Sequence, residues 1–155
     1  MAALKARFIP KNPQKYLGNP NNVQVRSSWE LKVCKWFDSH PSVLKWGSEE
    51  IKIPYIKPTD GKVHNYFPDF IAVIQNATGI PKKYIIEVKP LKETMLTEKS
   101  SNYDKINIAI NTAKWNYARA FAASKGFEFK ILTEVDLFRG APPTKVRRPR
   151  KVKAK

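Results

Sequence analysis

The spacing of hydrophobic positions in the first two thirds of the chain predicts one helix followed by strands. Trp29, Val33 and Trp36 recur at helical spacing, and Ser27 or Ser28 can cap the start of a helix that ends within residues 38–41. Residues 43–46 form only a short apolar stretch. Short apolar runs separated by turn residues then indicate a half-buried strand at 49–56, a short return strand at 63–66, and apolar strands at 69–75 and 83–89.

A second, longer helix is expected at about residues 103–125, where Gly126 can end it. Its apolar face is expected to carry Ile106, Ile110, Ala113, Tyr117, Ala120 and Phe121. Residues 127–132 predict a last strand, and Thr133 can cap a short helical turn after it. The order of the main elements is helix, three strands, long helix and strand. This order favours an α/β fold with a mixed central sheet flanked by helices.

Both ends of the chain differ from this patterned region. Residues 1–25 are rich in Pro, Asn and Lys, so we expect an irregular N-terminal arm that packs on the domain through Phe8, Tyr16 and Leu17. Seven of the fifteen residues from position 141 onward are Lys or Arg, and the only apolar residues besides proline are two Ala and two Val. This composition predicts a disordered basic tail at residues 140–155. The folded domain is therefore expected at residues 26–139.

The net charge of the chain indicates which class of molecule it binds. Lys and Arg total 29 against 13 Asp and Glu, so the formal net charge is +16. A chain of this charge attracts polyanions, and nucleic acid is the leading polyanion. An anionic membrane surface is the rival, but no apolar run is long enough to span a bilayer. The single cysteine, Cys34, excludes an internal disulfide and a cysteine-based zinc site, which fits a reducing cytosol. Charge alone does not separate a nuclease from a ribosomal or capsid protein.

Two carboxylates lie in apolar strand sequences. Asp69 opens the apolar strand at 69–75, and Glu87 lies near the end of the strand at 83–89. A carboxylate in such a setting is costly unless something satisfies it, and in so basic a protein two of them suggest a divalent cation. Mg²⁺, with Mn²⁺ as its substitute, prefers such oxygen ligands, and the carbonyl of Val88 can add a third. Lys89 follows Glu87 by two residues, so on a strand both point to the same side.

The sequence also allows structural roles for these residues. Pro-Asp is common in turns, and Glu87 with Lys89 can be an ion pair on a solvated sheet edge. Glu30 can be a helix surface charge that pairs with Arg26 at four-residue spacing. Glu49 is expected to be a strand-surface charge, although its position also allows it to lie near the site.

A second group of residues is expected to contact phosphate. Arg26 can hold a phosphate or brace Glu30, and Lys114 can face a phosphate or be a solvated charge on the long helix. In the basic tail, the expected nonspecific phosphate binders are Arg147, Arg148, Arg150 and Lys151. Contacts of this kind position a nucleic acid without reading its sequence.

Pro68-Asp69 followed by Glu87-Val88-Lys89 resembles the PD-(D/E)xK nuclease superfamily. The resemblance implies a restriction-endonuclease-like core, whose order of helix, three strands, helix and strand is the order expected here. It also implies that Glu30, on the first helix, completes the metal site. On this basis the catalytic residues are Glu30, Asp69, Glu87 and Lys89. The metal ligands are then Asp69, Glu87, Glu30 and the carbonyl of Val88.

Longer segments are similar to the head completion proteins of T-even-type tailed bacteriophages and, more distantly, to TnsA-type transposon-end endonucleases. These segments are Arg26-Ser27-Ser28-Trp29-Glu30, Trp46-Gly47-Ser48-Glu49-Glu50 and Tyr66-Phe67-Pro68-Asp69-Phe70. The resemblance implies a virion-associated nuclease that acts on double-stranded DNA when the filled head is finished and joined to the tail. It further implies portal or neck proteins as partners, and the virion or the host cytoplasm as the location.

Two functions from different classes follow. The first is a Mg²⁺-dependent deoxyribonuclease with little sequence specificity, whose activity requires the carboxylates. The alternative is a non-catalytic head-completion protein that uses a nuclease fold as a plug or a DNA clamp. This alternative function does not require the carboxylates. An RNA-binding protein, the third function considered, explains the charge but gives no reason for carboxylates inside strands.

Overall fold

A computed structural model describes residues 3–138 of the chain. A central sheet has the strand order β3-β6-β7-β8, formed by β3 (Val43–Ser48), β6 (Phe70–Gln75), β7 (Pro81–Val88) and β8 (Phe127–Leu132). β6 is antiparallel to both β3 and β7, whereas β7 and β8 are parallel. The long helix α2 (Asn102–Lys125) connects these parallel strands, and a short 3-10 helix η2 (Leu91–Glu93) precedes it. The expected mixed sheet is therefore present.

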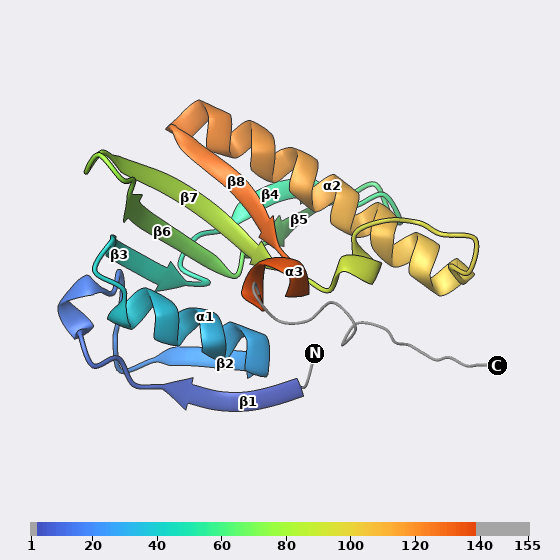
Figure 1. The fold of residues 1–155 in the computed structure, drawn as a ribbon. Coiled ribbons are helices and arrows are strands. Elements are labelled where there is room, and N and C mark those ends of the chain that lie inside the picture. The colour runs from blue at the N-terminus through green and yellow to red at the C-terminus, as the bar shows by residue number, and fades with distance from the viewer. Residues whose placement is uncertain (1–2, 139–155) are drawn as a thin grey trace.

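The two faces of the sheet are covered by different elements (Figure 1). On one side lie helix α1 (Ser28–Ser39) and a hairpin of β1 (Ala3–Phe8) and β2 (Val23–Ser27), which pack around Phe37 and Trp46. On the other side lie α2 and a hairpin of β4 (Ile53–Ile56) and β5 (Val63–Tyr66), which pack around Trp115. The short helix α3 (Glu134–Leu137) follows β8. Within residues 3–138, no helix is long and apolar enough to cross a membrane.

Strand alternation distributes the residues of β7 between the two faces. Ile86 and Val88 belong to the core on the α1 side, whereas Ile85 belongs to the core on the α2 side. Because successive side chains on a strand point to opposite faces, Glu87 points toward the α2 side. This alternation decides where the site residues of β7 lie.

The local signals at the helix ends are confirmed. Ser27 caps α1, where its Oγ accepts a hydrogen bond from the Glu30 N–H at 3.1 Å. Gly126 ends α2 with a φ of 77°, the left-handed conformation that glycine adopts without strain. Thr133 caps α3 in a reciprocal capping box with Asp136.

The expectation of an irregular arm at residues 1–25 is wrong. Strands β1 and β2 pair antiparallel there, and a short 3-10 helix, η1 (Pro13–Lys15), lies between them. Val23 and Val25 are fully buried in the α1-side core, which also takes Phe8 and Tyr16 as expected. The alternation of buried and exposed residues in β2 covers only five positions, so the surrounding Pro, Asn and Lys residues masked it. The expected disordered tail, residues 140–155, lies outside the described residues.

The strand assignments near residue 50 also change. Residues 43–48 form β3, the edge strand that pairs with β6, although only a short apolar stretch was expected there. The expected strand at 49–56 shortens to β4, which pairs with β5 in a separate hairpin. The three core strands that precede α2 are therefore β3, β6 and β7. The alternating residues 51–55 resemble a sheet strand because the hairpin buries one of its own faces against α2.

The apolar face expected for α2 is partly wrong. Its buried residues are Ile108, Trp115, Ala118 and Ala122. Ile110, Ala113 and Phe121 pack only at the flank of this face, while Ile106 and Tyr117 are 51% and 39% exposed. Apolar residues occur on several sides of this helix, so periodicity did not decide which side faces the core.

The packing of the N-terminal hairpin leads to a stability prediction. Val25→Ala should lower the free energy of unfolding by about 2 kcal/mol, because it removes buried methyl groups and leaves a cavity. Val63→Ala is the matched control, since Val63 also lies in a hairpin strand but is 70% exposed against 1% for Val25. The control should change stability by less than about 0.5 kcal/mol in urea titrations. Equal effects of the two substitutions would contradict the packing of β2 in the core.

Candidate active site

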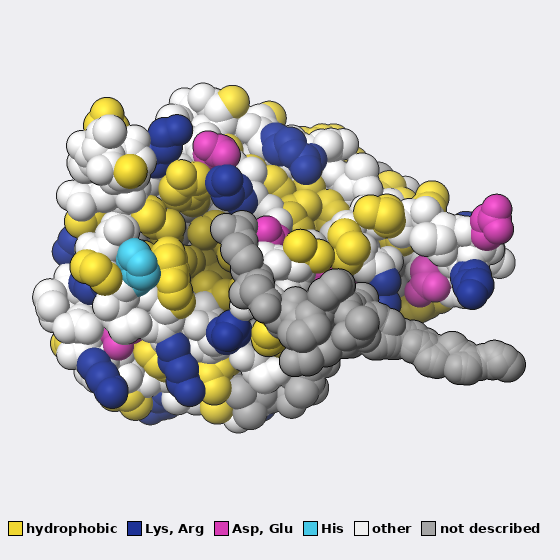
Figure 2. Space-filling model, viewed as in Figure 1, with side chains coloured by type: hydrophobic (Ala, Val, Ile, Leu, Met, Phe, Trp, Pro, Cys, Tyr) yellow, Lys and Arg dark blue, Asp and Glu magenta, His cyan; other side chains and the backbone are white. Residues whose placement is uncertain are grey.

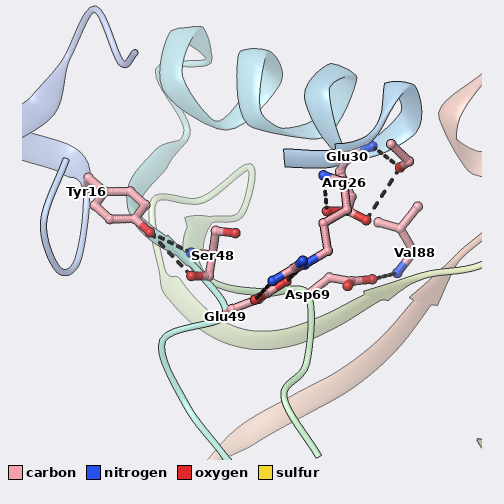
Figure 3. Close-up of polar contacts among 8 residues, drawn as sticks. Tyr16, Arg26, Glu30, Ser48, Glu49, Asp69 and Val88 are labelled. Atoms are coloured by element: carbon pink, nitrogen blue, oxygen red, sulfur yellow. Dashed lines mark hydrogen bonds and ion pairs between the residues drawn. The ribbon is translucent and has the colours of Figure 1, made fainter. Parts of the chain in front are cut away.

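Residues from five segments meet at one end of the central sheet (Figure 3). Arg26 lies near the end of β2, and Glu30 lies in the first turn of α1. Glu49 follows β3, and Asp69 precedes β6. Glu87 lies at the end of β7, with Lys89 just beyond it. The end of the sheet therefore brings together side chains that are up to 63 positions apart in the sequence (89 minus 26).

Three carboxylates form a compact cluster. One carboxylate oxygen from each of Glu30, Glu49 and Asp69 lies within 4.8 Å of the other two. Two oxygens bound to the same Mg²⁺ or Ca²⁺ ion are separated by at most about 4.2–5.2 Å, twice the metal–oxygen distance. A spacing of 4.8 Å therefore lies within the reach of one Ca²⁺-sized ion, and side-chain shifts of up to about 0.6 Å would bring the three oxygens within the reach of Mg²⁺.

Glu49 was expected on the strand surface but belongs to this cluster. Its backbone has a φ of 54°, and it is the one non-glycine residue with positive φ in the described part of the chain. Its N–H donates to the carbonyl of Asp69 at 3.0 Å, which ties the end of β3 to the start of β6. Such strained positions are enriched at functional sites. The sequence offered no signal for this conformation, because the turn at Glu49 contains no glycine of its own.

The N-terminal segment forms hydrogen bonds to Glu49 and to the residues on either side of it. The Tyr16 hydroxyl accepts a hydrogen bond from the Ser48 N–H at 3.1 Å and donates to Glu50 Oε2 at 2.9 Å. The Arg26 guanidinium forms two hydrogen bonds to the carboxylate of Glu49, at 2.8 and 3.1 Å (Figure 3). Arg26 therefore braces Glu49, and it contacts Glu30 only through its backbone N–H, at 3.3 Å.

Asp69 is the central member of the site. Its Oδ2 accepts a hydrogen bond from the Val88 N–H at 2.7 Å, which joins β6 to the end of β7. Burial raises the pKa of Asp69 well above its ordinary value, and the negative charges of Glu87 and Glu30 raise it further. Burial likewise raises the pKa of Glu30. A bound cation would relieve the cost of ionising these carboxyl groups.

Glu87 lies beside Asp69 but on the other side of the sheet end. Its Oε1 accepts a hydrogen bond from the Tyr66 hydroxyl at 2.5 Å, and Lys89 Nζ lies 3.8 Å from its Oε2. Burial raises the pKa of Glu87, while the bond from Tyr66 and the charge of Lys89 oppose the rise. Glu87 is therefore not part of the three-carboxylate cluster, because strand alternation directs it toward α2. The four residues expected to be catalytic are adjacent, with Asp69 between Glu30 and Glu87.

Lys114 faces this part of the site from α2. Its Nζ lies 5.9 Å from the centre of the Tyr55 ring and 5.7 Å from that of Tyr66. Burial lowers the pKa of Lys114, and the negative charge of Glu87 opposes the change. Lys114 is thus a half-buried cation beside Glu87, which disfavours its interpretation as a freely solvated helix charge.

Other side chains of types that often take part in catalysis lie away from this site. His64 pairs with Asp60 at 2.8 Å within the β4–β5 hairpin, and Cys34 is buried in the α1-side core. The expected phosphate binders of the tail, Arg147, Arg148, Arg150 and Lys151, lie outside the described residues.

Comparisons with known proteins identify the family of the chain. The profile of the family described as "TnsA-like endonuclease N terminal" matches residues 40–134, a segment that contains Glu49, Asp69, Glu87 and Lys89. The "Head completion nuclease" of Enterobacteria phage T4 is 34% identical over 153 aligned residues, which cover 90% of this chain and 99% of that protein. Together with the mixed sheet flanked by helices, the family match confirms the expected restriction-endonuclease-like fold. The chain therefore belongs to the family of TnsA-like endonucleases.

Proposed function

We propose that this chain is a divalent-metal-dependent endonuclease that hydrolyses phosphodiester bonds of double-stranded DNA with little sequence specificity. The observation that carries the proposal is the cluster of Glu30, Glu49 and Asp69, whose oxygens lie within 4.8 Å of one another beside Glu87 and Lys89. Membership in an endonuclease family supports the reaction. The net charge of +16 supports a polyanionic substrate.

The proposed cofactor is Mg²⁺, with Mn²⁺ as its substitute, because carboxylates are hard oxygen donors. When bound, the ion would lower the pKa of a water molecule and stabilise the extra negative charge on the phosphate. Asp69, Glu30 and Glu49 would hold it on the α1 side. Glu87 and the carbonyl of Val88, the ligands expected from β7, would join this set once the Glu87 carboxylate turns from the Tyr66 hydroxyl toward Asp69.

The cations of the site have separate proposed roles. Lys89 Nζ, held 3.8 Å from Glu87, would orient the attacking water and stabilise the negatively charged phosphate. Lys114, half-buried over two tyrosine rings, would hold a neighbouring phosphate oxygen. Arg26 would contact DNA only by exchanging its bond with Glu49 for one with a phosphate. The tail residues Arg147, Arg148, Arg150 and Lys151 are proposed to bind the DNA backbone without reading bases.

The similarity to a protein named head completion nuclease supports a biological role. We propose that the chain acts in phage head completion and in head–tail joining. The proposed partners are double-stranded DNA and the portal or neck proteins. The proposed location is the virion or the cytoplasm of the host.

Cleavage assays test the reaction. The Asp69→Ala and Lys89→Ala variants should each lose DNA cleavage in Mg²⁺ or Mn²⁺ on the order of a thousandfold. Each removes several kcal/mol of transition-state stabilisation, at about 1.4 kcal/mol per tenfold in rate. Asp60→Ala is the control, because Asp60 is an exposed carboxylate that contacts His64 away from the cluster. If the purified, folded protein cuts no DNA with either metal, the proposal is wrong and a structural role remains.

Two substitutions of Glu49 separate the effect of its negative charge from the effect of its positive φ. Glu49→Asn and Glu49→Gln should both raise the Mg²⁺ concentration needed for half-maximal cleavage by about tenfold or more, since each removes a carboxylate. Asn tolerates a positive φ better than Gln, so the Asn variant should also melt at a higher temperature than the Gln variant. Unchanged metal dependence in both variants would remove Glu49 from the metal site.

Because the pKa of Asp69 is raised, ionisation of this residue should lower the stability of the fold. A carboxyl group whose pKa is higher in the folded state stabilises the fold below its ordinary pKa, and this stability is lost as pH rises through the raised pKa. Without divalent metal at neutral pH, Asp69→Asn should therefore melt a few degrees above the wild type, at ~2–4 °C per kcal/mol. The Asn side chain can still accept the Val88 hydrogen bond.

The difference between Asp69→Asn and the wild type should shrink as pH is lowered, because Asp69 becomes neutral. Added Mg²⁺ should raise the melting temperature of the wild type but not that of the variant. Thermal melts in EDTA and in Mg²⁺ across pH measure both effects. A variant that melts below the wild type in EDTA at neutral pH would contradict the expected cost of the ionised cluster.

A further inference from the structure

An apolar groove lies between α1 and the strands β6, β7 and β8. It has a volume of about 800 Å³, and the hydrophobic part of its lining includes Ile74, Tyr84 and Leu132. Figure 2 shows the groove as a hollow with a hydrophobic floor on the visible face of the molecule. Its lining includes none of the carboxylates of the proposed metal site. The groove is therefore a separate feature of the surface.

The groove exists because α1 covers only part of its face of the sheet. The Phe37 ring of α1 packs at 5.4 Å on the Phe70 ring at the start of β6, and α1 also contacts β2 and β3. Away from these contacts, Ile74, Tyr84 and, on the edge strand β8, Leu132 are only partly buried. On the opposite face, α2 packs against β7 and β8. Sheets of this class are usually covered by helices on both faces, so the exposed strip has the place of a missing helix.

The rim of the groove is positively charged. Lys32 and Lys35 of α1 carry this charge on one side, and Lys130 of β8, whose Nζ lies 3.4 Å from Glu128 Oε2, lies on the other. The one acidic residue in the lining, Asp136, accepts a hydrogen bond from the Thr133 N–H at 2.9 Å in the cap of α3. Trp36, which is 45% exposed, adds a large apolar surface to the α1 wall. An occupant must therefore present apolar side chains between negative charges.

We propose that this groove binds a short amphipathic helix of a partner protein, apolar on its buried side and flanked by Asp and Glu. The α1 wall, residues 32–39, is about 12 Å long at 1.5 Å per residue, so it accommodates about two turns of such a helix. Three anchors at i, i+3 or i+4, and i+7 would fill the apolar floor.

Other occupants match the groove less well. Residues 141–155 contain seven Lys or Arg and would bring positive charge to a positive rim. A second copy of the chain offers no acidic helix of two turns within residues 3–138, because α1 has two acidic residues, α2 has one, and the acidic α3 is only four residues long. Duplex DNA complements the lysines but not the apolar floor. Charge and apolar surface together select the acidic amphipathic helix.

A peptide-display selection on the intact protein tests this proposal. A yeast-displayed library of random 16-residue amphipathic helices is selected for binding, and the enriched peptides should carry apolar residues at helical spacing flanked by Asp or Glu. Trp36→Ala and the double variant Lys32→Glu/Lys35→Glu should each weaken their binding at least tenfold. Lys92→Glu/Lys99→Glu is the matched control, because these two exposed lysines lie outside the groove, and it should not weaken binding.

Several outcomes would overturn the proposal. These are no enrichment, enrichment of basic peptides, or equal binding to the wild type and the groove variants. Displacement of the peptides by duplex DNA would assign the site to nucleic acid instead. None of these readouts depends on metal or on cleavage, so failure of this proposal is distinguishable from failure of the proposed nuclease activity.

Discussion

Mutual repulsion among three carboxylates is the constraint on which this structure depends. Glu30, Glu49 and Asp69 each place an oxygen within 4.8 Å of the others, and burial raises the pKa of Glu30 and Asp69. Side chains free to move would separate. The fold keeps them together through backbone hydrogen bonds, from Glu49 N–H to the Asp69 carbonyl and from Val88 N–H to the Asp69 carboxylate. The rigidity of the sheet end therefore preserves a high density of negative charge for a cation.

Part of this rigidity comes from outside the region that matches the family profile. The profile covers residues 40–134, whereas Tyr16, Arg26 and Glu30 precede it. Tyr16 bonds to the Ser48 N–H at the end of β3 and to the Glu50 carboxylate, and Arg26 forms an ion pair with Glu49 itself. The hairpin of β1 and β2 places these residues because Val23 and Val25 anchor it in the core. The N-terminal segment is thus part of the site as well as part of the fold.

The end of the sheet separates two kinds of chemistry. On the α1 side, Glu30, Glu49 and Asp69 concentrate negative charge. On the α2 side, Lys89 and Lys114 lie around Glu87, whose carboxylate is held by Tyr66. Asp69 lies between the two groups, so a phosphate bound there would meet the carboxylate cluster on one side and ammonium groups on the other. Such an arrangement suits a reaction in which negative charge accumulates on phosphorus.

The sequence by itself determined the features that depend on neighbouring residues. The caps at Ser27, Gly126 and Thr133 were predictable, because a cap is a contact within one turn of the chain. The Pro68-Asp69 and Glu87-x-Lys89 motifs were also visible, because an apolar strand with a carboxylate is unusual in sequence.

Only the tertiary structure decided which side chains share a face. It brought Glu49 into the acidic cluster through a positive φ, which the sequence does not indicate because position 49 is not glycine. It also directed Glu87 toward Tyr66. It also selected the Trp115 face of α2 from a helix with apolar residues on several sides. Periodicity reports that a face is apolar, but the choice among faces depends on packing against segments distant in the chain.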